Sequence, residues 1–421
     1  MRPLLLLLLL LAAPARAVPW KDSLDEALAE SRATGKPVLM EFKAPWCYSC
    51  YYMEKRVLSQ EPFARLSGRL ILLGVDVDRE EGRALKEKYR VTFLPTVVVL
   101  GAAGEAGRIV GEQTERDFLE QLQALLAAAP GGAEERAVAS LRARLAEGDL
   151  DRAQKDLAGL SRETREALSP RKDWRILSAR LSLKRAVRAK DPAGLEGFKE
   201  LLDLDDSCEL AYDAGLAGEL LPRLAAPERK AILERERRSL ETLAQKRIFA
   251  AGAERCADFR TAVEQLSGVY GALGLKDRSE ELLKRAAAFL EAEDARVGED
   301  RNLDDNLRVF LALAGEEAKL RALFEKLVAA YPADHVYAYR FAQYLESRKK
   351  PEEALPWIEK ADKLAYGANR LAVTRLRAQI LAKLGRKDEA RALLERDAKA
   401  GKKAFPQEAA QLEALLANLG K

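Results

Sequence analysis

Cys47 and Cys50 are the residues with the clearest chemistry, and they stand three apart in the segment Trp46-Cys47-Tyr48-Ser49-Cys50. Residues three apart at the start of a helix face the same side, so their sulfur atoms can meet at disulfide distance. Such a pair can pass between a dithiol and a disulfide. The free N–H groups at a helix N-terminus favour a Cys47 thiolate, so we expect Cys47 to be the exposed nucleophile and Cys50 the resolving thiol.

Two other interpretations of the pair are weaker. A zinc knuckle needs two more ligands nearby, but Cys208 and Cys256 are far away in the sequence and show no paired spacing. A purely structural disulfide that closes so small a loop restricts the unfolded chain little. We therefore predict redox chemistry and no metal. Cys208 and Cys256 form either a structural disulfide, which an oxidising compartment permits, or two isolated buried thiols.

Helices and strands alternate over residues 18–129, and these elements must position the pair. The capping box Ser23-Leu24-Asp25-Glu26 begins a helix, and Gly35-Lys36-Pro37 ends it. The pattern then predicts strands over 38–42 and 70–75, a helix over 82–89, a hairpin of strands 96–100 and 108–110, and a helix from Thr114 through Leu126. The predicted order is β-α-β-α-β-β-α behind a leading helix.

This order resembles the thioredoxin superfamily over about residues 20–129. Three features carry the resemblance: Trp-Cys-x-x-Cys after a strand, Glu41 six residues before Cys47, and Val91-Thr92-Phe93-Leu94-Pro95-Thr96 before the next strand. Residues 41–111 are most similar to the periplasmic thioredoxin-like domain that ends the membrane thiol:disulfide interchange reductase. The resemblance implies an α/β thioredoxin fold and a thiol–disulfide oxidoreductase whose only cofactor is its redox-active disulfide.

The resemblance also implies roles for residues around the cysteines. Glu41 corresponds to a buried acid that takes the proton of Cys50, although an exposed strand glutamate is the alternative. Pro95 corresponds to the cis-proline that faces the disulfide and leaves the backbone of Leu94 open to an extended peptide. Trp46 and Tyr48 are expected to form a contact surface for substrates. The predicted catalytic residues are Cys47, Cys50, Glu41 and Pro95, and the predicted substrate-binding residues are Trp46, Tyr48 and Leu94.

The second half of the chain has a different pattern. Residues 130–133, with Pro130-Gly131-Gly132, are a predicted linker, and residues 134–421 form a predicted all-helical domain with repeats clearest over 258–400. Ser279, Ala318, Ala354 and Ala390 open second helices of hairpins and are spaced 39, 36 and 36 apart; twelve residues before each stands Ser267, Asn306, Ala342 or Ala378. None of these is bulky, so two helices could cross there. The domain resembles tetratricopeptide repeats, which implies a protein partner.

Composition and the N-terminal residues limit the function further. The chain of 421 residues is long enough for two or more domains, and 71 basic against 67 acidic residues favour no nucleic acid partner. The single histidine, His335, nearly excludes histidine triads and multi-histidine metal sites, and we expect it at the surface. Residues 1–17, with Arg2 and eight leucines before Ala15-Arg16-Ala17, predict a signal peptide. We expect a soluble protein exported to the bacterial periplasm, with no transmembrane segment after residue 17.

These observations favour an exported thiol–disulfide oxidoreductase that reduces or isomerises protein disulfides. The intervening Tyr48-Ser49 lacks the histidine of strongly oxidising relatives, which favours the reductase or isomerase direction. The expected partners are protein thiols or disulfides, a membrane thiol carrier as electron donor, and a protein bound by the helical repeats. The alternative is a repeat-based adaptor or assembly protein that uses the thioredoxin-like domain for docking.

Overall fold

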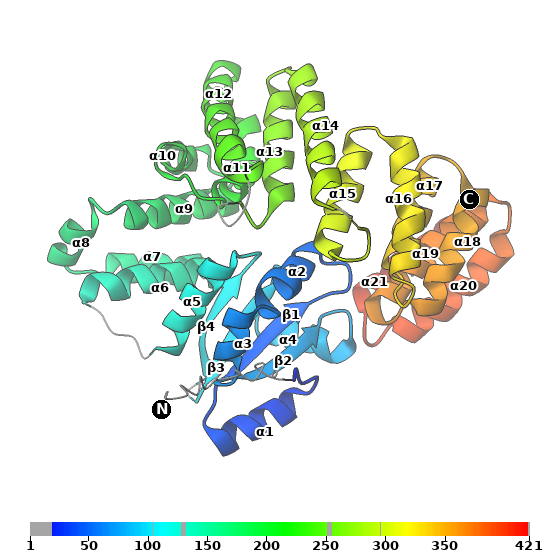
Figure 1. Ribbon diagram of the computed structural model, residues 1–421, viewed down its shortest axis with the longest axis horizontal. Helices are drawn as coiled ribbons and strands as arrows, with labels where there is room; N and C mark the ends of the chain where they lie inside the picture. The colour runs from blue at the N-terminus through cyan, green and yellow to red at the C-terminus, as the bar shows by residue number, and fades with distance from the viewer. Residues whose placement is uncertain (1–18, 103, 128–131, 251–254, 295, 420–421) are drawn as a thin grey trace, which may run out of the picture.

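The computed structural model describes residues 19–102, 104–127, 132–250, 255–294 and 296–419 (Figure 1). An α/β part built on a four-stranded sheet comes first, and a long all-helical part follows it. The predicted signal peptide at residues 1–17 and residues 130–131 of the predicted linker at residues 130–133 lie outside the described residues.

The sheet of the first part has the strand order β2-β1-β3-β4. Strand β1 pairs with β2 in parallel and with β3 antiparallel, and β4 continues the sheet as the antiparallel partner of β3. Its elements are α1 (Leu24–Thr34), β1 (Val38–Lys43), α2 (Tyr48–Met53), η1 (Glu54–Leu58), α3 (Glu61–Ser67), β2 (Ile71–Asp76), α4 (Glu80–Lys88), β3 (Thr96–Gly101), β4 (Gly104–Val110) and α5 (Glu115–Leu126). This is a thioredoxin fold, as predicted, with α3 as an additional short helix.

Both faces of the sheet are covered because side chains alternate along each buried strand. Val38, Met40 and Phe42 of β1 pack on one face together with residues of α1 and α4. Leu39 packs on the opposite face against residues of η1, α3 and α5. The central strand β1 is therefore buried on both sides, and the loop that follows it is held on a rigid base.

Capping residues set the ends of the flanking helices where the sequence predicted them. The Ser23 hydroxyl accepts a hydrogen bond from the Glu26 N–H at 3.4 Å, and α1 ends at Gly35, whose φ of +71° suits glycine. The Thr114 hydroxyl accepts one from the Asp117 N–H at 3.2 Å and begins α5. These local signals confirm the predicted bounds of both helices.

The described residues between 132 and 419 form helices and contain no strand of the sheet. The elements are α6 (Ala133–Glu147), α7 (Leu150–Ala158), α8 (Arg162–Leu168), α9 (Lys172–Ala189), η2 (Pro192–Gly194), α10 (Leu195–Leu204), α11 (Leu210–Gly218), η3 (Leu221–Arg223), α12 (Ala226–Leu243), η4 (Ala244–Ile248), α13 (Phe259–Ala272), α14 (Lys276–Glu293), α15 (Arg301–Leu313), α16 (Glu317–Ala330), α17 (Val336–Ser347), α18 (Pro351–Leu364), α19 (Gly367–Lys383), α20 (Lys387–Gly401) and α21 (Pro406–Asn418).

The predicted small-residue positions lie where paired helices cross. Ser267 of α13 and Ser279 of α14 share a hydrogen bond of 2.7 Å between their hydroxyl groups. Ala342 and Ala354, on α17 and α18, are both fully buried. Side chains this small let the axes of neighbouring helices approach closely, which explains why the spacing recurs along the array.

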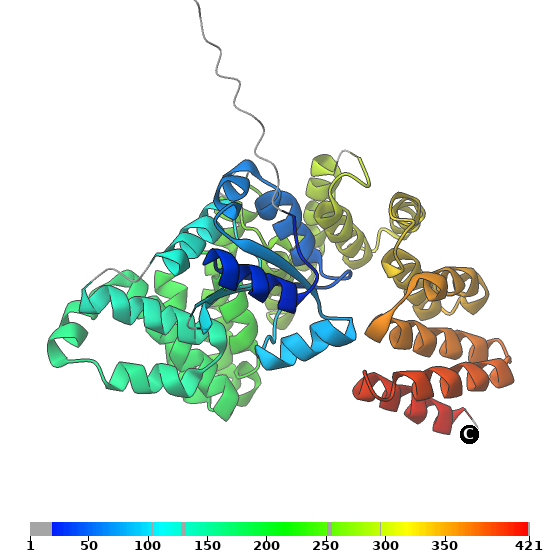
Figure 2. The same cartoon turned by 90° about the horizontal axis from the view of Figure 1, so that it is seen from below.

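The helices arch around the α/β part, with α6–α9 on one side of it and α17–α21 on the other (Figures 1 and 2). Gly367, at the start of α19, lies against the Asp78 carbonyl, and a Cβ at this position would be 2.0 Å from that oxygen. The next residue, Ala368, donates its N–H to the same carbonyl at 3.1 Å. The absence of a side chain at Gly367 thus permits direct backbone contact between the two parts.

Candidate active site

A disulfide joins Cys47 and Cys50 at the N-terminus of α2. Strand β1 ends at Lys43, and a turn in which the Cys47 N–H donates to the Ala44 carbonyl at 3.1 Å leads into the helix. Cys47 is the N-cap residue, and its sulfur accepts a hydrogen bond from the Cys50 N–H at 3.1 Å. When the disulfide is reduced, this donor and the helix dipole can stabilise a Cys47 thiolate.

The prediction that Cys47 is the exposed member of the pair is wrong. Cys47 is 5% exposed and Cys50 is 3% exposed, so both are buried. Helix α15 of the helical part packs against α2, and residues of α15 and α17 contact the segment on both sides of Cys47. Within the thioredoxin-like part, both cysteines also belong to the apolar cluster that includes Phe42 and Ala44.

Glu41 is buried in the central strand, with 1% of its surface exposed. Its Oε2 atom is 3.3 Å from the Lys43 ammonium, while Oε1 has no hydrogen-bond partner among the described residues. Burial raises the pKa of Glu41, Lys43 opposes the rise, and the charge of Glu54 adds to it. The carboxyl group can therefore hold or release a proton at a higher pH than a surface glutamate, as its predicted role requires; that role stays a prediction.

The loop before β3 brings Pro95 and two apolar residues to the same end of the sheet. The Leu94–Pro95 peptide bond is cis, and Leu94 is half-buried against the core that includes both cysteines. Trp46 and Phe93 are 42% and 45% exposed, which is unusual for large apolar side chains in this protein. Trp46 precedes Cys47 directly, and Phe93 makes an edge contact with the Tyr212 ring of the helical part at 6.3 Å between ring centres.

The helical part also contributes to the surroundings of the disulfide. The Arg260 guanidinium lies 3.7 Å from the centre of the Tyr48 ring, and the Tyr48 hydroxyl donates to Asp258 at 3.4 Å. Burial and the Asp258 charge raise the pKa of Tyr48. The Trp46 indole N–H donates to Asp78 at 2.8 Å, and Asp78 accepts a second bond from the Asn369 amide at 2.9 Å. Much of the Tyr48 surface is thus used within the chain.

Glu112, just after β4, is a second buried carboxyl group near the motif. Neither of its oxygens has a hydrogen-bond partner among the described residues. Burial raises its pKa well above the usual range, and the Asp258 charge adds to the rise. Its position after a Gly residue at a strand end gave no signal of burial, so sequence reasoning missed it.

The remaining cysteines and the histidine lie in the helical part. A second disulfide joins Cys208, between α10 and α11, to Cys256, between η4 and α13. His335 is 4% exposed and packs near Tyr366 at a ring-centre distance of 6.3 Å, so the expectation of a surface histidine is wrong. It precedes α17, whose packing against the neighbouring helices buries it. Among the described residues, no group of three or more Cys, His, Asp or Glu side chains could hold a metal ion.

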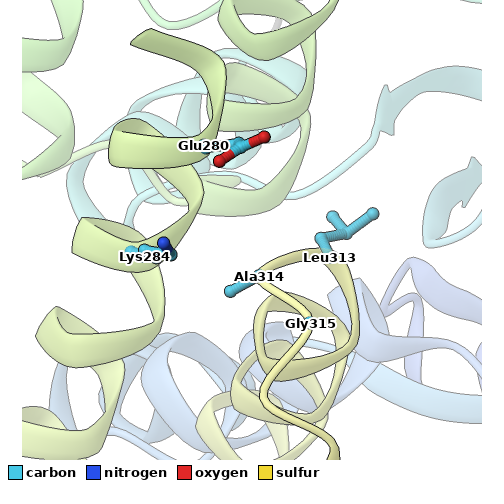
Figure 3. Close-up of a pocket in the computed structure, with 5 residues that line it drawn as sticks. All are labelled: Glu280, Lys284, Leu313, Ala314 and Gly315. Carbon is cyan, nitrogen blue, oxygen red and sulfur yellow. The ribbon is translucent and has the colours of Figure 1, made fainter. Parts of the chain in front are cut away.

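A surface pocket of about 300 Å³ lies between α14 and the turn from α15 to α16 (Figure 3). It is lined by Glu280, Lys284, Leu313, Ala314 and Gly315. Leu313 ends α15, whereas the residues of this helix that contact the motif lie near its start. The pocket therefore contains none of the predicted site residues.

Two residues of the helical part contact the motif through its backbone, and sequence reasoning missed both. The Asn302 amide donates to the Tyr48 carbonyl, and the Arg340 guanidinium donates to the Trp46 carbonyl, each at 2.9 Å. One signal could have found the first: residues 299–306 are almost entirely polar, although the repeat spacing places Asn306 at a helix crossing, and the structure buries it. Polar residues at buried positions of a repeat helix indicate a specific partner.

The fold and the paired cysteines define a thioredoxin-like domain with a Cys-x-x-Cys disulfide. Residues 19–102 match the profile of a thioredoxin-like family. The thiol:disulfide interchange protein DsbD 2 of Pseudomonas aeruginosa is 39% identical over 106 residues, which cover 24% of this chain and 18% of that protein. A thioredoxin from Thermus thermophilus is 34% identical, with a TM-score of 0.25 over 26% of this chain and 88% of its own.

The helical part has a likeness of its own. A tetratricopeptide repeat protein from Parabacteroides merdae matches 69% of this chain and 100% of its own, with 17% identity and a TM-score of 0.42. The chain spans less than a fifth of the length of the interchange proteins that it matches. No helix in the described part of the chain combines the length and the apolar character needed to cross a membrane.

Proposed function

We propose that this protein is an exported thiol–disulfide oxidoreductase that reduces or isomerises disulfides of other proteins. The observation that carries the proposal is the Cys47–Cys50 disulfide at the N-terminus of α2, where the Cys47 sulfur already accepts an N–H hydrogen bond. The buried carboxyl group of Glu41, in the strand that leads to this helix, supplies a proton acceptor with a raised pKa.

The reaction begins from the dithiol form. The Cys47 thiolate attacks one sulfur of a substrate disulfide; that S–S bond breaks, a Cys47–substrate disulfide forms, and the other substrate sulfur leaves as a thiolate that takes up a proton. Cys50 passes its proton to Glu41 and attacks the Cys47 sulfur, which releases the second substrate thiolate. The substrate gains two electrons, and Cys47 and Cys50 become the disulfide seen here.

A new cycle requires a dithiol donor, for which we propose a membrane thiol carrier on the periplasmic side. The signal-like residues 1–17 and the likeness to interchange proteins support export to the bacterial periplasm. The exposed rings of Trp46 and Phe93, together with Leu94 and the backbone before Pro95, are proposed to bind an extended segment of the substrate. The helical repeats are proposed to bind a protein partner.

The experiment traps the mixed disulfide. A Cys50→Ala variant, expressed with export, holds substrates on Cys47 because the resolving thiol is missing, and the attached proteins are identified after purification. The Cys47→Ala/Cys50→Ala double variant is the control. Proteins that are present with the single variant and lost with the double variant support the proposal. An empty trap beside partners retained by both variants would contradict it and favour a repeat-based adaptor.

A further inference from the structure

Side chains of the helical part bind backbone carbonyls on both sides of Cys47, in addition to the hydrogen bonds made within the thioredoxin-like part. Arg340, on α17, donates from Nη2 to the Trp46 carbonyl at 2.9 Å. Asn302, on α15, donates from Nδ2 to the Tyr48 carbonyl at 2.9 Å. Among residues 46–48, the carbonyl groups of Trp46 and Tyr48 therefore accept hydrogen bonds from side chains more than 250 positions away in the chain.

Both donors are fixed by further contacts, so they are preorganised for this task. The Asn302 Oδ1 atom accepts a hydrogen bond from Asn306 at 3.2 Å, and its backbone N–H donates to Asp300 at 3.1 Å. Arg340 forms an ion pair with Asp305, which is fully buried on α15. Groups held in this way lose little conformational entropy when they bind the motif.

The Arg340 guanidinium adds a positive charge next to the backbone of Cys47. Its partner Asp305 also pairs with Arg260 at 2.7 Å and with Arg308 at 3.0 Å, so three guanidinium groups surround one carboxylate. The carboxylates of Asp258, Asp300 and Glu112 also face this region and oppose the effect. Loss of one guanidinium changes the balance in one direction only: it makes a thiolate at Cys47 less favourable.

One ion pair joins the thioredoxin-like part to the helical part away from the disulfide and serves as a comparison. Glu408 of α21 pairs with Arg83 of α4 at 2.6 Å. Within the described part of the chain, neither side chain of this pair forms a hydrogen bond or ion pair with residues 46–50, although the pair bridges the same two parts of the molecule.

We infer that Asn302 and Arg340 are positioning residues of the active site, which hold the backbone on both sides of Cys47, and that Arg340 favours the thiolate there. The inference rests on the proposed function and extends its site into the helical part. Residues of the helical part thus partly set the reactivity of Cys47.

The test uses the full-length protein with Arg340→Gln, Arg340→Lys and Asn302→Ala, and with Glu408→Gln as the matched control. Each is equilibrated with reduced and oxidised glutathione, and the fraction of Cys47–Cys50 disulfide is measured by thiol labelling. Arg340→Gln is expected to shift the equilibrium about tenfold toward the disulfide, because the reduced form loses its stabilised thiolate, and this corresponds to about 30 mV for a two-electron couple. The rate of Cys47 alkylation by iodoacetamide should fall in parallel.

Arg340→Lys keeps the charge and should restore most of the alkylation rate, whereas Asn302→Ala should give a smaller shift of the same sign. Glu408→Gln should match the wild type. Circular dichroism identifies any variant that does not fold, and Asn302→Ala then carries the test. Equal equilibria in all variants, or an equal shift in Glu408→Gln, would overturn the inference while the proposed function stands. A wild type that exchanges with no thiol would instead overturn the proposed function.

Discussion

The two disulfides of this chain lie in regions that use a disulfide in different ways. Cys47 and Cys50 are three residues apart at a helix N-terminus, beside donors that can stabilise a thiolate. Cys208 and Cys256 are 48 residues apart and join two turns of the helical part. In the chain-entropy account the short loop stabilises the folded state by roughly 2 kcal/mol and the long loop by about 4 kcal/mol.

This difference shows that sequence separation and local geometry together distinguish a reactive disulfide from a structural one. Reduction of a disulfide that closes a short loop costs little stability, so the pair can cycle between oxidation states while the domain stays folded. A long loop that pins helices α10 and α11 to α13 gives up much more. Removal of Cys47 and Cys50 should therefore affect activity more than stability, whereas removal of Cys208 and Cys256 should affect stability more than activity.

The largest expected effect is on catalysis at the first disulfide. Cys47→Ala should lower the rate of insulin disulfide reduction by at least about 10³-fold, because a methyl group cannot act as the nucleophile. The assay follows insulin precipitation in the presence of a thiol reductant. A variant that keeps more than a tenth of the wild-type rate would place the chemistry elsewhere in the chain.

The second disulfide should affect stability instead. Cys208→Ala/Cys256→Ala is expected to lower the free energy of unfolding by about 4 kcal/mol and to leave the insulin reduction rate near that of the wild type. Urea unfolding followed by circular dichroism measures the first quantity. If the double variant is as stable as Cys47→Ala/Cys50→Ala, the comparison between the two loops fails.

A smaller effect is expected at Glu41. A substitution there tests proton transfer separately from nucleophilic attack. Because burial raises the pKa of Glu41, its proton-accepting form accumulates as pH rises through that pKa, and resolution by Cys50 should accelerate with it. Glu41→Gln should slow this step about 10²-fold at neutral pH and abolish the acceleration. Stopped-flow measurement of mixed-disulfide decay provides the test, with the exposed Glu105→Gln as control; equal decay rates in all three proteins would remove Glu41 from the mechanism.

The last effect is on the pH dependence of stability and concerns a buried carboxyl group in the helical part. Glu236 of α12 is 2% exposed, and burial raises its pKa to about 8. Between the ordinary glutamate pKa and this value the unfolded chain binds fewer protons than the folded one, so stability should fall as pH rises, by roughly 1.4 kcal/mol per pH unit from this group.

Glu236→Gln should flatten that dependence, since an amide does not titrate. Urea unfolding at pH 5 and pH 8 measures the difference between the variant and the wild type. Glu228→Gln, an exposed position on the same helix, is the control and should keep the wild-type dependence. A Glu236→Gln variant with the same pH dependence as the wild type would show that this side chain ionises freely in the folded state.

Local patterns were sufficient to predict most helices and strands of the first part, and their order together with the cysteine motif gave the resemblance that implied a thioredoxin fold. The capping residues Ser23 and Thr114 and the apolar run of β1 act over a few neighbours, so their effects can be read from the chain directly. The small residues at helix crossings, such as Ser267 and Ser279, were predictable for a related reason, because the repeat places equivalent residues at equivalent contacts.

The composition of the active-site surroundings could not be predicted in this way. Asn302 and Arg340 reach the motif only because the stacked helices arch back over the end of the sheet, and that curvature is the sum of many small rotations between neighbours. The burial of His335 beside Tyr366 likewise depends on how helices distant in the chain pack together. The residues of the chain by themselves determined which groups can react and which elements carry them. The tertiary structure alone decided which distant side chains surround those groups. Their positions depend on the rotations between all the helices that lie between them and the sheet.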